Sequence, residues 1–318
     1  MANAKPHRNG NNGHPATAAK SRLAQNDSTE AAARLPVLKT YKIYIGGKFP
    51  RTESGRFYLL KNPTTGEAIA NMCLCSRKDF RESVLAARAV QGGWAGRSAY
   101  NRAQIIYRIA EMLEGRAAQF VSEMIQMGLP ETEARAEVEA SVDRLVYYAG
   151  WADKYQQIFS SVNPVATSHF NFSVLEPTGV VALLAPQNSG LIGLISTLIP
   201  AVAGGNSVIA LASRDLPLCA VTLSEVLATS DLPGGVVNIL TGERGELIEH
   251  FASHMDVNAI IYCGDDAAER TAVRVKSASN VKRAICYDRT DWMATEAQNP
   301  YLILDAQEIK TTWHPIGV

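Results

Sequence analysis

The second half of the chain alternates short apolar runs with segments of helical character. The apolar runs cover residues 179–185, 207–211, 236–240, 259–262 and 283–286, and the helical segments cover residues 191–203, 217–229, 245–252 and 267–277. A continuous apolar run is typical of a parallel strand buried on both faces. This alternation predicts a doubly wound α/β fold with a parallel sheet, and such folds bind ligands at the carboxyl ends of their strands.

The first half of the chain predicts a small region of strands followed by helices. Residues 42–49 alternate in polarity and turn at Gly46 and Gly47, which is a hairpin signal, and residues 62–67 predict a second turn. Apolar spacing predicts helices around residues 80–90 and 105–113. The same spacing predicts a long third helix from about residue 131 to 159.

Residues 1–35 contain few large apolar side chains, so we expect a disordered tail there. The first 26 residues carry four basic side chains and no acid, which leaves a targeting peptide as the alternative. No apolar run is long enough to span a bilayer, and no secretory signal is recognisable. We therefore expect a cytoplasmic protein.

Composition excludes several classes of function. The 318 residues have a net charge of zero, which argues against binding to nucleic acid or to an anionic membrane. Five cysteines lie in apolar settings, and their odd number indicates reduced, buried thiols rather than disulfides. Cys73 and Cys75 are too close together for the usual zinc spacing, and we expect no metal site.

Several segments, taken in order from about Tyr41 to Arg283, resemble the aldehyde dehydrogenase family. The most specific are residues 199–206, which read Ile-Pro-Ala-Val-Ala-Gly-Gly-Asn, and 232–242, which read Leu-Pro-Gly-Gly-Val-Val-Asn-Ile-Leu-Thr-Gly. Shorter matches lie at residues 44–49, 62–67, 86–89, 93–94 and 176–181. The resemblance implies a Rossmann-type, doubly wound parallel sheet with helices before it.

The C-terminal segment 308–313 resembles the strand that ends the family's chains and joins a neighbouring subunit. In the family an entire catalytic domain lies before that strand, where this chain has only a short stretch. The resemblance thus implies a cofactor-domain scaffold over residues 36–285, a linker at 286–300 that replaces the catalytic domain, and an oligomerisation strand at 301–318.

Aldehyde oxidation in the family needs a thiolate, donors for an oxyanion, a general base and a nicotinamide. No cysteine of this chain matches the nucleophile, which belongs to the missing domain. Asn188 matches the oxyanion asparagine, although it can instead tie down its loop. Tyr287 stands at the general-base position, where a phenol is a poor base at neutral pH. Asp288 is the alternative after a slip of one residue.

Cys263 is the best substitute for the nucleophile, because it lies at the end of a predicted strand. Asp265 and Asp266 follow it, and we expect their charges to raise its pKa and oppose thiolate formation. We therefore predict that Cys263 is structural.

The resemblance places a cofactor site at Pro186, Gln187, Arg214, Gly242 and Gly264. Arg214 replaces an acid that holds the adenosine ribose in the family, so it either suits the 2′-phosphate of NADP or is a solvated surface arginine.

The remaining cofactor positions depart from the family. Leu211 replaces the lysine that binds the ribose, and Glu269 replaces the second glycine of the phosphate turn. Asp265 and Asp266 are expected to serve as cap and first-turn residues of the following helix, where their charges oppose a pyrophosphate. We expect binding of NAD or NADP to be weak or lost.

Three hypotheses of function follow. In the first, the protein is an oxidoreductase-like pseudoenzyme, a non-catalytic subunit that assembles with a full-length aldehyde dehydrogenase or with itself through the long helix and the terminal strand. In the second, it is an NAD(P)-dependent aldehyde oxidoreductase with relocated chemistry. In the third, it is an NAD(P)-binding sensor. The sequence departs from the family at the general base, at the two residues that bind the ribose and at the phosphate turn, whereas the packing motifs are retained. This distribution favours the first hypothesis.

Overall fold

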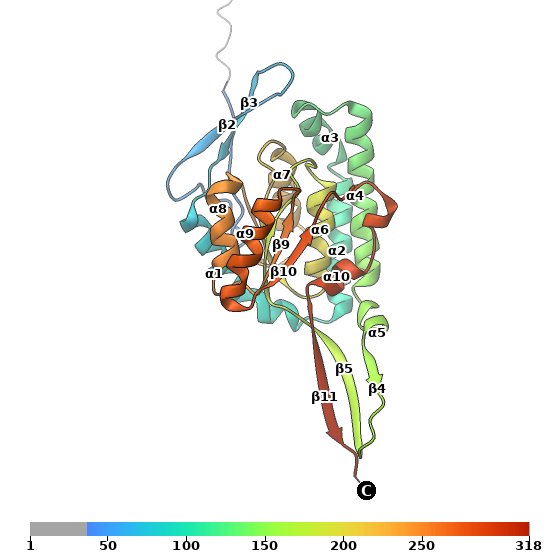
Figure 1. Cartoon of the computed structure of the whole chain (residues 1–318). Helices are drawn as coiled ribbons and strands as arrows, with labels where there is room; N and C mark the ends of the chain where they lie inside the picture. The colour runs from blue at the N-terminus through green and yellow to red at the C-terminus, as the bar shows by residue number, and fades with distance from the viewer. Residues whose placement is uncertain (1–36, 318) are drawn as a thin grey trace, which may run out of the picture. The chain divides into compact units, whose positions relative to one another are not determined.

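A computed structural model describes residues 37–317, and the predicted tail at residues 1–35 lies outside them. Five parallel strands form the central sheet in the order β10-β9-β6-β7-β8 (Figure 1), which confirms the doubly wound prediction. The order reverses between β9 and β6. The strands are β6 (Val180–Leu184), β7 (Ser207–Leu211), β8 (Val237–Leu240), β9 (Ala259–Cys263) and β10 (Arg283–Tyr287).

Helices cover both faces of this sheet, and every residue of four of its strands is therefore buried. One face packs against α6 (Ile192–Ala203) and α7 (Leu218–Ala228). The other face packs against α1 (Arg77–Ala95), α8 (Arg244–Ser253) and α9 (Ala267–Ser277). The two apolar clusters on either side of the sheet form the core.

The helices before the sheet form an additional layer outside α6. They are α2 (Ala99–Glu114), α3 (Ala117–Gln126) and α4 (Glu131–Trp151), and the short α5 (Tyr155–Phe159) follows them and contacts residues 169–177. The predicted single helix over 131–159 is wrong, because the chain turns at residues 152–154 between α4 and α5. Helix α3 was not predicted, and α1 packs on the sheet rather than only preceding it.

The N-terminal strands are β1 (Thr40–Tyr41), β2 (Phe57–Lys61) and β3 (Ala68–Cys73), with the predicted turn at residues 62–67 between β2 and β3. The hairpin predicted at 42–49 is reduced to a turn closed by one bridge between Ile45 and Lys48. Gly46 and Gly47 have φ of 60° and 78° there, which suits glycine.

The strand predicted over residues 301–318 is shorter than expected, because residues 301–305 form a short helix, and it pairs within its own chain. Strand β11 (Gln307–Pro315) runs antiparallel to β5 (His169–Pro177), which also pairs with β4 (Ser161–Asn163). We call these three strands the arm, and Figure 1 shows them extending beyond the helices. The short helix η1 (Ala278–Asn280) precedes β10. Between β10 and β11 the described chain has only the short helices η2 (Thr295–Ala297) and α10 (Tyr301–Asp305). No helix among residues 37–317 is long and apolar enough to cross a membrane.

Candidate functional site

A cleft of about 500 Å³ lies at the carboxyl ends of β6, β9 and β10. This is where a doubly wound sheet binds its ligands. The structure brings five of the predicted site residues into the lining, and it places Arg214 and Gly242 outside it. The five are Pro186, Gln187, Asn188, Gly264 and Tyr287, and Cys263, which was predicted to be structural, lines the cleft as well.

Arg244, the first residue of α8, crosses the crevice at the point where the strand order reverses. Its guanidinium donates to the carbonyl of Ala185 after β6 and, at 3.0 Å, to that of Cys263 at the end of β9. The carboxylate of Glu269 lies 3.6 Å away, and the arginine side chain is only 12% exposed. The side chain of Arg244 therefore occupies this crevice.

The turn after β9 is organised by the chain's own acids. Asp266 caps α9, as predicted, by accepting from the N–H groups of Ala268 and Glu269 at 2.7 and 3.0 Å. The prediction that Asp265 serves the same helix is wrong, because its carboxylate accepts from the N–H of Arg289 at 2.6 Å.

Gly264 is required by its neighbours. A Cβ atom there would lie 2.7 Å from the hydroxyl of Tyr262 and 2.9 Å from Nη1 of Arg244. The hydroxyl of Tyr262 donates to Glu269 at 3.0 Å. The absence of a side chain at Gly264 thus leaves room for the cluster formed by Tyr262, Arg244 and Glu269.

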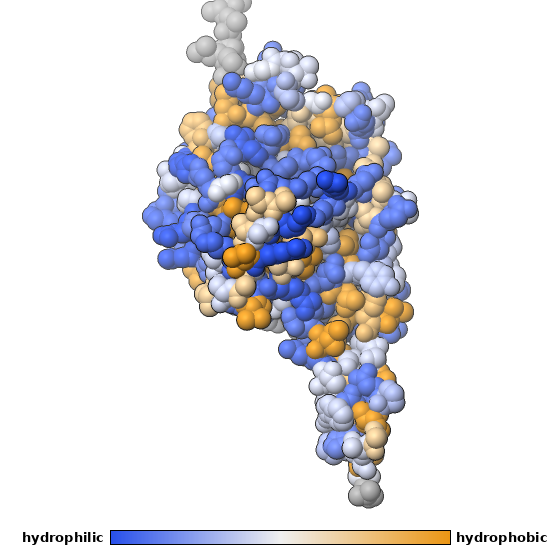
Figure 2. Space-filling model, in the orientation of Figure 1, coloured by the Kyte–Doolittle hydropathy of each residue, from blue (hydrophilic) through white to orange (hydrophobic). Residues whose placement is uncertain are grey.

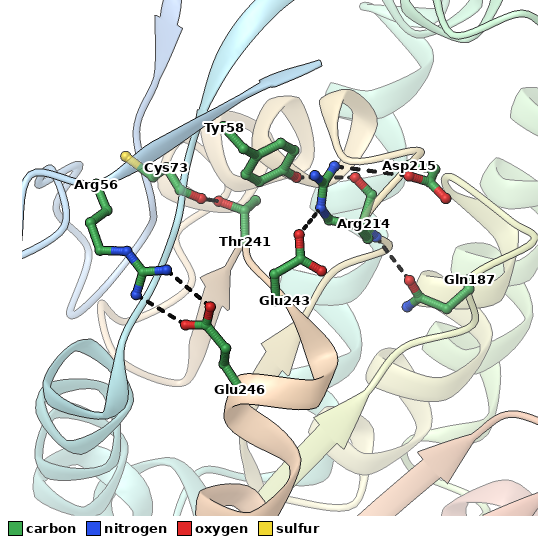
Figure 3. A network of polar contacts seen from close by, with 9 residues as sticks. All are labelled: Arg56, Tyr58, Cys73, Gln187, Arg214, Asp215, Thr241, Glu243 and Glu246. Carbon is green, nitrogen blue, oxygen red and sulfur yellow. Dashed lines mark hydrogen bonds and ion pairs between the residues drawn. The ribbon is translucent and has the colours of Figure 1, made fainter. Parts of the chain in front are cut away.

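Arg214 belongs to a separate polar network (Figure 3). Its guanidinium forms an ion pair with Glu243 and lies 3.7 Å from the ring centre of Tyr58. The main-chain N–H of Arg214 donates to the side-chain oxygen of Gln187 at 2.9 Å. Because the Arg214 side chain is paired and 31% exposed, the alternative of a solvated surface arginine is wrong. A 2′-phosphate of NADP would have to compete with Glu243 for the guanidinium.

Asn188 and Tyr287 have different surroundings in the cleft. The side chain of Asn188 is exposed and has no hydrogen-bond partner within residues 37–317, so it does not tie down its loop. The hydroxyl of Tyr287 donates to Asp305 at 2.7 Å. Burial, together with the Asp305 charge, raises the pKa of Tyr287, which therefore stays a neutral phenol. Asp288 is engaged in an ion pair with Arg270.

The cysteines offer no activated thiol. All five are free, and Cys73, Cys75, Cys219 and Cys263 are buried as predicted, whereas Cys286 is half-buried. Burial raises the pKa of Cys263, and the nearby Arg244 only partly opposes this effect. We expected the charges of Asp265 and Asp266 to raise this pKa, and that expectation is wrong. Among the described residues, no group of His, Cys, Asp and Glu side chains is arranged to hold a metal ion.

We predict that Cys263 is alkylated at least about 100-fold more slowly than Cys286 in the folded protein at pH 8, because a buried thiol of raised pKa is protonated and shielded. Mass spectrometry after timed exposure to iodoacetamide measures both rates. In guanidinium chloride the two rates should become similar. Equal rates in the folded protein would mean that Cys263 is accessible and reactive.

Comparison with known proteins places these features in a family. Residues 50–312 match the model described as "Aldehyde dehydrogenase family". Aminoacetaldehyde dehydrogenase of Pseudomonas aeruginosa is 30% identical over 267 residues, which are 83% of this chain and 53% of that protein. Omega-crystallin of Enteroctopus dofleini is 29% identical over 256 residues, which are 79% of this chain and 51% of that protein.

Solved structures show the same relation. An NAD+ complex of an aldehyde dehydrogenase from Bacillus cereus superposes with a TM-score of 0.74 at 25% identity, over 78% of this chain and 50% of that chain. The chain thus spans about half the length of the relatives that it matches. Because the family model matches most of its residues, the protein belongs to the aldehyde dehydrogenase family.

Proposed function

We propose that the protein is a non-catalytic subunit that assembles with a full-length aldehyde dehydrogenase. The observation that carries this proposal is Arg244, whose guanidinium hydrogen-bonds across the crevice between β6 and β9. No cysteine of the described chain is both exposed and placed in the cleft, so a nucleophile is lacking as well. The scaffold supports assembly better than catalysis.

The residues present do not fit NAD or NADP. In a doubly wound fold the pyrophosphate lies at the start of a helix beside the crevice, where main-chain N–H groups and the helix dipole attract it. Here Asp266 already takes two of those N–H groups at the start of α9. Glu269 places a further carboxylate beside Arg244. Negative side chains and an occupied crevice both oppose a dinucleotide.

We expect 1 mM NAD+ or NADP+ to raise the melting temperature by less than about 1 °C, because a ligand that does not bind the folded state cannot stabilise it. Thermal denaturation with and without each nucleotide measures this, with a full-length family enzyme as the positive control. A rise of several degrees would favour the sensor hypothesis. Turnover of an aldehyde panel by the isolated chain would favour relocated chemistry.

The arm presents the surface that we propose for assembly. Strand β11 pairs on only one side, so its outer edge lacks a partner strand within the described chain. Large apolar side chains are exposed along it, with Ile309 at 64% and Trp313 at 56%. Figure 2 shows apolar side chains among polar ones on the arm.

The long helix adds a second apolar surface. A cleft of about 700 Å³ lies along α2 and α4, and its lining includes the exposed side chains of Tyr100, Tyr107 and Val146. Exposed apolar surface of this kind is typical of sites where proteins associate. Both surfaces implied by the family resemblance are therefore available for a partner subunit.

We expect the double substitution Ile309→Asp and Trp313→Asp to lower recovery of a co-expressed aldehyde dehydrogenase at least about 30-fold, because two charges would have to be buried at the interface. Affinity capture followed by quantitative mass spectrometry measures recovery. Lys310→Ala and Thr312→Ala on the same strand serve as the matched control and should leave recovery within about twofold. Undiminished recovery with the charged variant would show that the arm is not part of the interface.

A further inference from the structure

The two edges of the five-stranded sheet differ in how they end. At the β8 edge, Tyr44 exchanges two main-chain hydrogen bonds with Ile239, at 2.9 and 2.8 Å, and thereby closes the edge. At the other edge, β10 pairs with β9 alone, and no described segment pairs with its outer side. All five residues of β10 are half-buried, whereas every residue of the other four strands is buried.

The register of β10 decides which of its main-chain groups are free. The N–H of Arg283 donates to Asn258 at 3.1 Å, and the carbonyl of Tyr287 accepts from Gly264 at 3.4 Å. The direction of the main-chain N–H and C=O groups alternates along a strand. These groups of residues 283, 285 and 287 therefore point toward β9, and those of Ala284 and Cys286 point away from it. Within residues 37–317 the N–H and C=O groups of Ala284 and Cys286 have no hydrogen-bond partner.

We propose that β10 pairs antiparallel with β10 of a second copy of this chain, so that two five-stranded sheets join into one. A two-fold axis through Ile285 sets Ala284 opposite Cys286 of the second copy. In that register every free N–H of one strand meets a free C=O of the other. A pairing of this type is self-complementary, so one patch serves both copies.

The charged residues at the ends of β10 favour the antiparallel direction. Lys282 and Arg283 stand at its start and Asp288 follows its end. With the axis through Ile285, antiparallel pairing sets Asp288 of one copy opposite Lys282 of the other, whereas in-register parallel pairing would place like charges together. Within each copy Asp288 pairs with Arg270, and Lys282 donates to the carbonyl of Ala252. The outward residues of the strand are small and uncharged. The lysine, proline or bulge that protects many sheet edges is absent from residues 283–287.

The register is tested by a single new cysteine. In the proposed pair, residues 284 and 286 of opposite copies form a hydrogen-bonded pair with Cα atoms about 5.5 Å apart, which suits a disulfide. We expect Ala284→Cys to give a dimer band on a non-reducing gel after mild oxidation, through the native Cys286. Ala284→Ser, and Ala284→Cys combined with Cys286→Ser, should give no such band. Failure of Ala284→Cys to cross-link in folded protein would overturn the register.

The pairing itself is tested apart from the arm. In a background of Ile309→Asp and Trp313→Asp, we expect light scattering to report a dimer that dissociates on dilution. Cys286→Pro removes an outward N–H without touching the ladder to β9, and should raise the dimer dissociation constant about 30-fold or more. Cys286→Ser is the matched control and should change it less than threefold. A monomeric background variant would refute the β10 pairing while leaving the proposed assembly with an aldehyde dehydrogenase intact.

Discussion

Replacing Glu137 by alanine is expected to lower the free energy of unfolding by about 3–4 kcal/mol. This glutamate of α4 is buried, and its Oε1 accepts from the Ser189 hydroxyl at 2.9 Å and from the N–H groups of Leu191 and Ile192 at 3.0 Å each. These donors form the start of α6, where the helix dipole favours a negative charge. Alanine would leave all three donors buried without an acceptor.

Urea denaturation followed by circular dichroism measures this loss. Glu137→Gln retains an acceptor oxygen and should cost less, about 1–2 kcal/mol. Glu139→Ala, on the exposed side of the same helix, is the matched control and should change stability by less than about 0.5 kcal/mol. If Glu137→Ala were as mild as Glu139→Ala, the carboxylate would not be the cap of α6.

Replacing Arg144 by alanine is expected to cost about 3 kcal/mol of unfolding free energy. The arginine is buried, and burial lowers its pKa. It donates to the Ser196 hydroxyl at 2.6 Å and to the carbonyls of Ala297 and Trp292 at 3.0 and 3.1 Å. The substitution would remove these bonds and leave a cavity, because the guanidinium joins α4, α6 and the segment between β10 and α10.

The same substitution should also loosen residues 288–300. Limited proteolysis is expected to cut there at least about tenfold faster than in the unchanged protein, because both carbonyls that accept from Arg144 belong to this segment. Arg108→Ala is the control, since Arg108 forms an exposed pair with Glu111 and should matter little. An intact segment in a destabilised variant would show that the arginine acts through α6 alone.

The strands of the central sheet could be predicted because each is a short apolar run between turn residues. Their observed ends fall within one residue of the predicted ones, for example Val180–Leu184 against 179–185. The helix predicted over 131–159 ran too far, because residues 152–154 contain neither glycine nor proline to mark its end. Helix α3 was missed because it is short and lacks a side-chain cap.

The candidate site was predicted only in part. Positions after strands, such as Asn188 and Gly264, could be placed in one cleft from the sheet alone. Arg244 and Glu137 were missed, because each acts on a segment more than 50 residues away and only the folded chain brings them together. A charged residue at the start of one helix and a glutamate along another both read as solvent-facing in the sequence.

The most direct test of the proposed function is to capture the tagged chain from its native host and to measure the recovered species by light scattering and mass spectrometry. The proposal predicts a complex that contains a full-length aldehyde dehydrogenase in stoichiometric amount. Recovery of this chain alone, with no full-length relative, would contradict it, and would direct attention to Asn188, Arg214 and Cys263 as the residues to substitute in tests of nucleotide binding.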